Sequence, residues 1–140
     1  METLIPLIRK NVTLNFPDWS VPGKPGSNIT VCELDWLALH AASPSFRPRL
    51  LPANNGQPFD LVLVVDCIYH PSLLPALVDT INTVTVSRET AVLVVAELRA
   101  DDVILTFLEL WLSSGGWEIW RIGGNLLEMT YVMWVGWRTT

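Results

Sequence analysis

The sequence is poor in positive charge and in long apolar runs, and both shortages exclude classes of function. It contains 9 Lys and Arg against 14 Asp and Glu, which gives a formal net charge of -5. No cluster of Lys or Arg occurs, so the electrostatic footprint of a nucleic-acid-binding protein is missing. No apolar run approaches the roughly 20 residues that a membrane-spanning helix needs, and no signal peptide is visible. We therefore expect a cytoplasmic protein, with the nucleus as a second compartment, that binds neither nucleic acid nor membrane.

Cysteine and histidine are also scarce, with two of each. Cys32 and Cys67 lie in separate apolar segments, which is typical of reduced core cysteines in a cytosolic protein. His40 and His70 fit no metal-binding spacing, so we predict no metal site, and His70 before a proline suits a helix start or the surface. The sequence has no Gly-x-Ser-x-Gly elbow, no P-loop and no Gly-x-Gly-x-x-Gly, which argues against the enzymes that use those motifs.

The apolar residues that are present, half of all 140 and including seven Trp, are enough for the core of one domain. Their periodicity predicts helices at 2–15, 71–84 and 101–113, and strands at 29–34, 59–65, 91–96, 117–122 and 129–137. The last two strands form an antiparallel hairpin around a turn at 123–125, and Gly115 and Gly116 stop the preceding helix. Segments 16–28 and 41–58 are loops rich in proline and glycine. Strands alternating with helices predict an α/β domain with a largely parallel sheet.

Polar residues follow three of the predicted strands, where an open α/β sheet binds its ligands. Every position from 61 to 65 is apolar, which predicts a strand buried on both faces before this polar end. For each acidic residue the alternative role is to cap the helix that follows. The polar strand ends are Glu33, Asp35 and Trp36 after the first strand, Asp66 and Tyr69 after the second, and Glu97 and Arg99 after the third.

The segments "VCELDW", "FDLVLVVDCIY" and "AVLVVAELR", in that order, resemble the seven-β-strand S-adenosylmethionine-dependent methyltransferases. The similarity is to the protein-lysine methyltransferases of family 16, and within them to fungal ribosomal lysine methyltransferase 5 and the methyltransferase-like 21 proteins. The Asp-Trp pair at 35–36 and the Asp-x-x-Tyr motif at 66–69 carry the resemblance. It implies a partial Rossmann-like class I methyltransferase sheet, S-adenosylmethionine as the cofactor, and a protein substrate presenting a lysine, of ribosomal or translation origin.

The resemblance also implies roles for single residues. Trp36 would pack against the adenine of the cofactor, with Asp35 beside it, and the backbone of Val65 would lie against the cofactor. Asp66 and Tyr69 would be the catalytic residues that hold the substrate lysine at the entrance. Two alternatives stay open: Trp36 as a core tryptophan and Asp66 as a helix cap, in an unrelated α/β binding domain.

Part of the family pattern has no counterpart among these 140 residues. The family carries a Gly-x-Gly-x-Gly loop after its first strand, and its sheet order is 3-2-1-4-5-7-6. With strands 1 and 2 missing, we expect a single partial methyltransferase domain over 1–140, loosely placed at 1–58 and compact at 59–140. The strand at 61–65 becomes an exposed edge that can self-associate. The alternative function is that of an inactive remnant acting as a protein-interaction module.

Overall fold

The computed structural model describes residues 4–52, 57–86, 88–123 and 130–139, and the chain forms two compact units. The first unit comprises Met1–Leu34 and the second Asp35–Thr140. Each unit has its own secondary structure, and each is described by itself.

The first unit consists of one helix and a chain of turns. Helix α1 (Leu4–Asn15) agrees with the predicted helix at 2–15 within the described residues, and none of its side chains is buried. After the helix the chain folds back, because the Trp19 indole donates a hydrogen bond to Thr13 Oγ1 at 3.1 Å. Gly26, with φ of 81°, passes so close to Phe16 that an added Cβ would lie 2.8 Å from the Phe16 ring. Glycine is needed at that position for both reasons.

The prediction of a strand at 29–34 is wrong, because this segment has no regular secondary structure. A strand is stable only when a neighbour accepts and donates its backbone hydrogen bonds, and no described strand pairs with these residues. Cys32 lies in this segment and was predicted to be a core cysteine. That prediction is also wrong, because its side chain is exposed.

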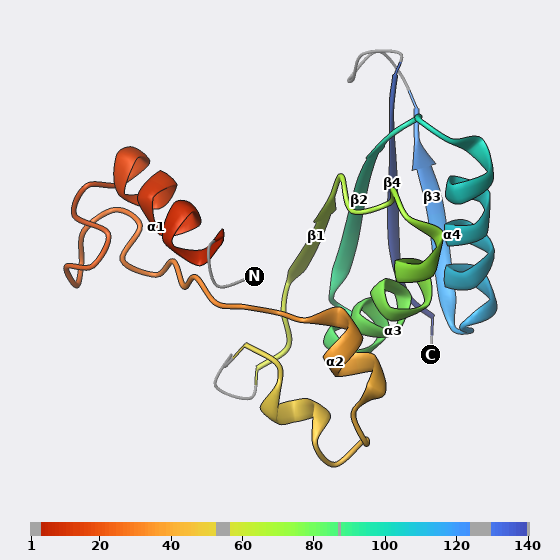
Figure 1. The fold of residues 1–140 in the computed structure, drawn as a ribbon, viewed down its shortest axis with the longest axis horizontal. Helices are drawn as coiled ribbons and strands as arrows, with labels where there is room; N and C mark the ends of the chain where they lie inside the picture. Colours follow the sequence, from red (N-terminus) through yellow and green to blue (C-terminus); the bar gives the residue numbers. More distant parts are fainter. Residues whose placement is uncertain (1–3, 53–56, 87, 124–129, 140) are drawn as a thin grey trace. The chain divides into compact units, whose positions relative to one another are not determined.

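The second unit is built on a four-stranded sheet (Figure 1). Its strands are β1 (Leu61–Val65), β2 (Ala91–Glu97), β3 (Trp117–Ile122) and β4 (Tyr131–Arg138), in the order β1-β2-β4-β3. This order agrees with the order 4-5-7-6 that the resemblance implies for the later strands. The pair β1–β2 is parallel, whereas β2–β4 and β3–β4 are antiparallel. The predicted hairpin is therefore confirmed, but the prediction of a largely parallel sheet is wrong for these strands. Part of the predicted turn, 124–125, lies outside the described residues.

The predicted helices at 71–84 and 101–113 are both confirmed. The first begins as a 3₁₀ turn, η2 (Pro71–Leu73), and continues as α3 (Leu74–Val84), while the second is α4 (Asp101–Ser113). His70 caps η2 by accepting a hydrogen bond from Ser72 N, as its position before the proline predicted. Two elements were not predicted: the short helix α2 (Trp36–Ala41) and the 3₁₀ turn η1 (Arg47–Arg49).

The core lies between α3, α4 and one face of the sheet. Alternate strand residues, such as Val92 and Val94, are buried against the helices because neighbouring side chains of a strand point to opposite faces. The Trp111 ring in α4 lies at the centre, with ring centroids 5.5 Å from Phe107 and 5.3 Å from Trp117. Tilted and edge-on aromatic pairs of this kind add to the stability gained by burying the rings.

Strand β1 forms one edge of the sheet, which confirms the prediction of an edge strand at 61–65, but the exposure of its side chains corrects the prediction of burial on both faces. Val64 is only 5% exposed, but Leu61, Leu63 and Val65 are 51%, 60% and 58% exposed. The apolar sequence predicted burial on both faces, whereas only the face toward the helices is covered. A run of apolar residues reports the propensity of the segment to form a strand, but not whether a second layer covers it.

Candidate functional site

The carboxyl ends of β1 and β2 lie side by side, because these two strands are parallel and in register. Asp66 directly follows β1, and its backbone N–H donates a hydrogen bond to the Val95 carbonyl at 2.8 Å. Its φ of 52° puts it in the left-handed region, the sole described non-glycine residue there. Asp tolerates this conformation better than most residues. The bend ends the strand, and the Asp66 carboxylate lies at the carboxyl end of β1.

Arg99 connects the ends of the two strands. One guanidinium nitrogen lies 3.5 Å from Asp66 Oδ2, and Nε makes a short contact with Glu97 Oε2. The hydrogen bond to Glu97 and, after it, the charge of Asp66 raise the pKa of the Arg99 guanidinium. Arg99 and Asp66 have side chains 60% and 51% exposed, so a ligand can reach both from solvent. The sequence predicted that these three residues lie at strand ends on one rim of the sheet, but not that Arg99 contacts both acids.

The Asp-x-x-Tyr motif divides into exposed ends and a buried middle. Tyr69 is exposed, whereas Ile68 is buried and Cys67 packs against the core. The Cys67 thiol donates a hydrogen bond to the Val65 carbonyl at 3.3 Å, and burial raises the pKa of this thiol. The two middle residues therefore anchor the loop, and Asp66 and Tyr69 are left available at the surface.

Asp35 and Trp36 begin helix α2 of the same unit. Asp35 Oδ1 accepts a hydrogen bond from Ala38 N at 3.0 Å, so this carboxylate caps the helix. Trp36 is half-buried and packs against the core. No hydrogen bond or ion pair of the described residues joins this pair to Asp66 or Tyr69. Glu33, the other acid of the "VCELDW" segment, lies in the first unit.

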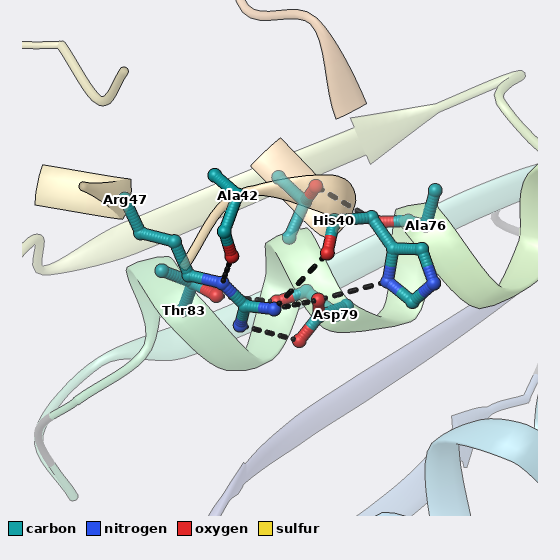
Figure 2. Close-up of polar contacts among 7 residues, drawn as sticks. His40, Ala42, Arg47, Ala76, Asp79 and Thr83 are labelled. Atoms are coloured by element: carbon teal, nitrogen blue, oxygen red, sulfur yellow. Dashed lines mark hydrogen bonds and ion pairs between the residues drawn. The ribbon is translucent and has the colours of Figure 1, made fainter. Parts of the chain in front are cut away.

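A polar cluster fastens α2 to α3 (Figure 2). His40 Nδ1 lies 2.9 Å from Asp79 Oδ2, and Arg47 reaches both Asp79 oxygens at 2.8 and 3.0 Å. Arg47 also donates to the carbonyls of Ala42 and His40, so one guanidinium closes the loop that follows α2. Sequence reasoning missed this cluster, because Asp79 is 39 and 32 residues from its partners and no spacing pattern connects them.

Residues 1–114 match the family model described as lysine methyltransferase. The matched part includes Asp66, Tyr69, Glu97 and Arg99 as well as the Asp35–Trp36 pair. Among curated proteins no match is found. No helix in the described part of the chain is both long and apolar enough to cross a membrane.

Proposed function

Because this chain belongs to the lysine methyltransferase family, we propose that it serves the S-adenosylmethionine-dependent methylation of a lysine side chain in a protein substrate. The observation that carries the proposal is the placement of Asp66 and Tyr69, both exposed at the carboxyl end of β1. We propose a ribosomal or translation protein as the substrate, on the strength of the sequence resemblance, and the cytoplasm or nucleus as the compartment.

The second unit has residues whose chemistry fits the adenosine part of the cofactor. Trp36 is only partly buried, and we propose that an adenine stacks on its indole, an interaction worth about 1–3 kcal/mol in base stacking on aromatic side chains. Because Asp35 fixes the first turn of α2, it holds the Trp36 backbone in place. Val65 would lie against the cofactor through its backbone. When bound, S-adenosylmethionine supplies a methyl group from a positively charged sulfur, which keeps the electron pair of the broken bond.

The substrate lysine must reach the methyl group as a neutral amine, although a free lysine is protonated near pH 7. An exposed carboxylate such as Asp66 attracts the ammonium form first and orients its nitrogen. The Tyr69 hydroxyl, three residues further on, holds the nitrogen from a second side. Fixing one reactant in the correct orientation lowers a barrier by avoiding loss of rotational and translational freedom at the reaction step.

The test is transfer of a radiolabelled methyl group to a ribosomal extract, with the wild-type chain and the Asp66→Asn and Tyr69→Phe variants. We expect wild-type labelling of a protein band and a loss of about 100-fold or more for Asp66→Asn. Asp60→Asn is the matched control, because Asp60 lies at the opposite end of β1. Equal labelling by wild type and Asp66→Asn, or no labelling by wild type, would contradict the proposal. Calorimetry with S-adenosylhomocysteine and a Trp36→Ala variant tests cofactor binding separately.

A second candidate function is protein interaction through β1, and a specific observation favours it. Three apolar side chains, Leu61, Leu63 and Val65, are more than half exposed on the edge strand. Because every copy of the chain presents the same edge, two copies can pair their β1 strands across a two-fold axis. An antiparallel pair centred on Leu63 places Asp60 of one copy opposite Asp66 of the other, so charge repulsion weakens it.

Sedimentation at several salt concentrations tests this pairing. Salt screens the repulsion between carboxylates, so the dimer fraction should rise from 50 mM to 1 M NaCl. Leu63→Lys should abolish the dimer, because a charge on an edge strand blocks pairing. Leu105→Lys is the control, since Leu105 on α4 is 59% exposed, close to the exposure of Leu63. A dimer that salt weakens, or that survives Leu63→Lys, would rule out the β1 interface.

A further inference from the structure

The cluster at the carboxyl ends of β1 and β2 has an unbalanced charge. Asp66 and Glu97 contribute two carboxylates, and Arg99 is the cation that contacts both of them. When all three groups are ionised the cluster carries one net negative charge. A substrate lysine entering as an ammonium ion would balance that charge, so the cluster can receive one further cation.

Arg99 does not hold its two partners equally. Its Nε donates a hydrogen bond to Glu97 Oε2, whereas its contact with Asp66 Oδ2 is 3.5 Å, at the outer limit of a hydrogen bond. Glu97 is also the less exposed carboxylate, at 27% against 51% for Asp66. Arg99 can therefore withdraw from Asp66 while it keeps its hydrogen bond to Glu97. The Asp66 carboxylate is the member of the cluster that an incoming cation can take over.

We propose that Arg99 is a positioning residue that competes with the substrate lysine for Asp66 and, once the lysine is bound, favours its neutral form. The inference rests on the proposed function, because it assigns Asp66 to the lysine. Two consequences oppose one another. Competition for Asp66 weakens the binding of the ammonium form, while the nearby positive charge makes that form release its proton to water more readily.

The physical basis of the second consequence is repulsion between like charges. A cation beside a lysine disfavours the protonated state, so the pKa of the lysine falls. Arg99 itself stays protonated, because Glu97 and Asp66 raise the pKa of its guanidinium further. The proton leaves to solvent, which reaches the half-exposed Asp66 carboxylate. The lysine nitrogen then has a lone pair with which to accept the methyl group.

The other polar groups around the cluster do not supply this positive charge. Tyr131 in β4 pairs with Glu97 in the strand register and carries a phenol, not a cationic group. Cys67 packs inward, and burial raises the pKa of its thiol. Tyr69 adds a phenol. Among the described residues that contact Asp66, Arg99 is thus the group that can act on a bound lysine as a cation.

The test compares wild type with Arg99→Gln, which removes the charge, and Arg99→Lys, which keeps it. For Arg99→Gln we expect a lower KM for the lysine substrate and a kcat about tenfold lower at pH 7. The acid limb of its pH–rate profile should move up by about one pH unit, which corresponds to that tenfold change. Arg99→Lys should restore the wild-type profile. Arg121→Gln, at an exposed position of β3, is the control and should change neither parameter.

A binding experiment without turnover separates this inference from the proposed function. Titration with n-butylammonium, followed by NMR shifts of Asp66 and Tyr69, should show tighter binding to Arg99→Gln than to wild type or Arg99→Lys. Equal binding by all three proteins would overturn the inference, even if wild type methylates lysine. If the wild type shows no methyltransferase activity but Arg99→Gln still binds n-butylammonium more tightly than the wild type does, the inference is supported and the proposed function fails. An unchanged KM and pH profile in an active Arg99→Gln enzyme would also overturn it.

Discussion

Gly136 in β4 lies directly beneath the Trp111 indole of α4. A Cβ added at residue 136 would lie 2.8 Å from Trp111 Cζ2 and 3.3 Å from Ile119 Cγ1. The helix approaches the sheet this closely because residue 136 has no side chain. The largest buried side chain of the core thus depends on the smallest residue of the strand below it.

Gly136→Ala should therefore destabilise the protein, because the new methyl group displaces a fully buried ring in a close-packed core. The expected loss is about 1–3 kcal/mol of unfolding free energy, the usual cost of overpacking. Urea titration followed by Trp fluorescence measures it. Gly123→Ala is the matched control, because a Cβ there meets nothing within 4 Å. Similar unfolding midpoints for the two variants would show that Trp111 can move aside without cost.

Asn82 near the end of α3 joins three elements through one amide oxygen. Its Oδ1 accepts hydrogen bonds from Trp117 Nε1 at 2.9 Å, Arg138 at 3.0 Å and Ser114 at 3.3 Å. Arg138 also lies 4.5 Å above the Trp117 ring, and desolvation lowers the pKa of its guanidinium. Asn82→Ala leaves a partly buried indole N–H and a guanidinium without this acceptor.

We expect Asn82→Ala to lower the free energy of unfolding by about 1–3 kcal/mol, the cost of leaving polar groups unsatisfied. Asn82→Asp keeps the acceptor and adds a charge beside Arg138, so it should stay close to wild type at pH 7. Thermal melts of the three proteins provide the measurement. If Asn82→Asp melts as low as Asn82→Ala, the stability depends on the amide N–H₂ group rather than on the oxygen.

Asp79→Ala should loosen α2 and the loop after it, because His40 and Arg47 lose their common partner on α3. Hydrogen bonds to charged groups contribute about 1.5–3 kcal/mol each, and less where solvent reaches them. The half-exposed His40 should therefore matter less than Arg47. Limited proteolysis between residues 42 and 50 measures the loosening. We expect faster cleavage in Asp79→Ala and in Arg47→Ala than in His40→Ala. Equal cleavage rates in all three variants would show that the polar cluster does not fasten α2 to α3.

The two cysteines should differ in reactivity. Cys32 is exposed, whereas burial raises the pKa of the half-buried Cys67 thiol. Because the thiolate is the reactive form, a raised pKa leaves less of it at a given pH. Iodoacetamide near pH 8 should modify Cys32 first, and Cys67 only as the pH rises further. Mass spectrometry of Cys32→Ser and Cys67→Ser variants assigns each rate, and faster labelling of Cys67 would contradict its packing against the core.

The sequence alone determined the local elements with strong periodicity. The spacing of Ile104, Phe107 and Trp111 predicted α4, and the glycines after it predicted where the helix ends, because these signals depend on neighbours along the chain. The placement of Asp66 and Tyr69 at a strand end was readable for the same reason. Segment 29–34 was predicted wrongly, because apolar residues show strand propensity but do not show whether a pairing strand exists.

Tertiary structure alone decided the contacts between residues distant in the sequence. The exposure of Leu63, the cluster of His40 and Arg47 on Asp79, and the sharing of Arg99 between Glu97 and Asp66 all depend on which elements become neighbours. Sequence patterns repeat over a few residues, whereas the contacts of Arg47 with Asp79 and of Arg99 with Asp66 join residues 32 and 33 positions apart. Local chemistry therefore placed an acid and a tyrosine at the end of β1, and packing of the sheet brought Arg99 beside that acid.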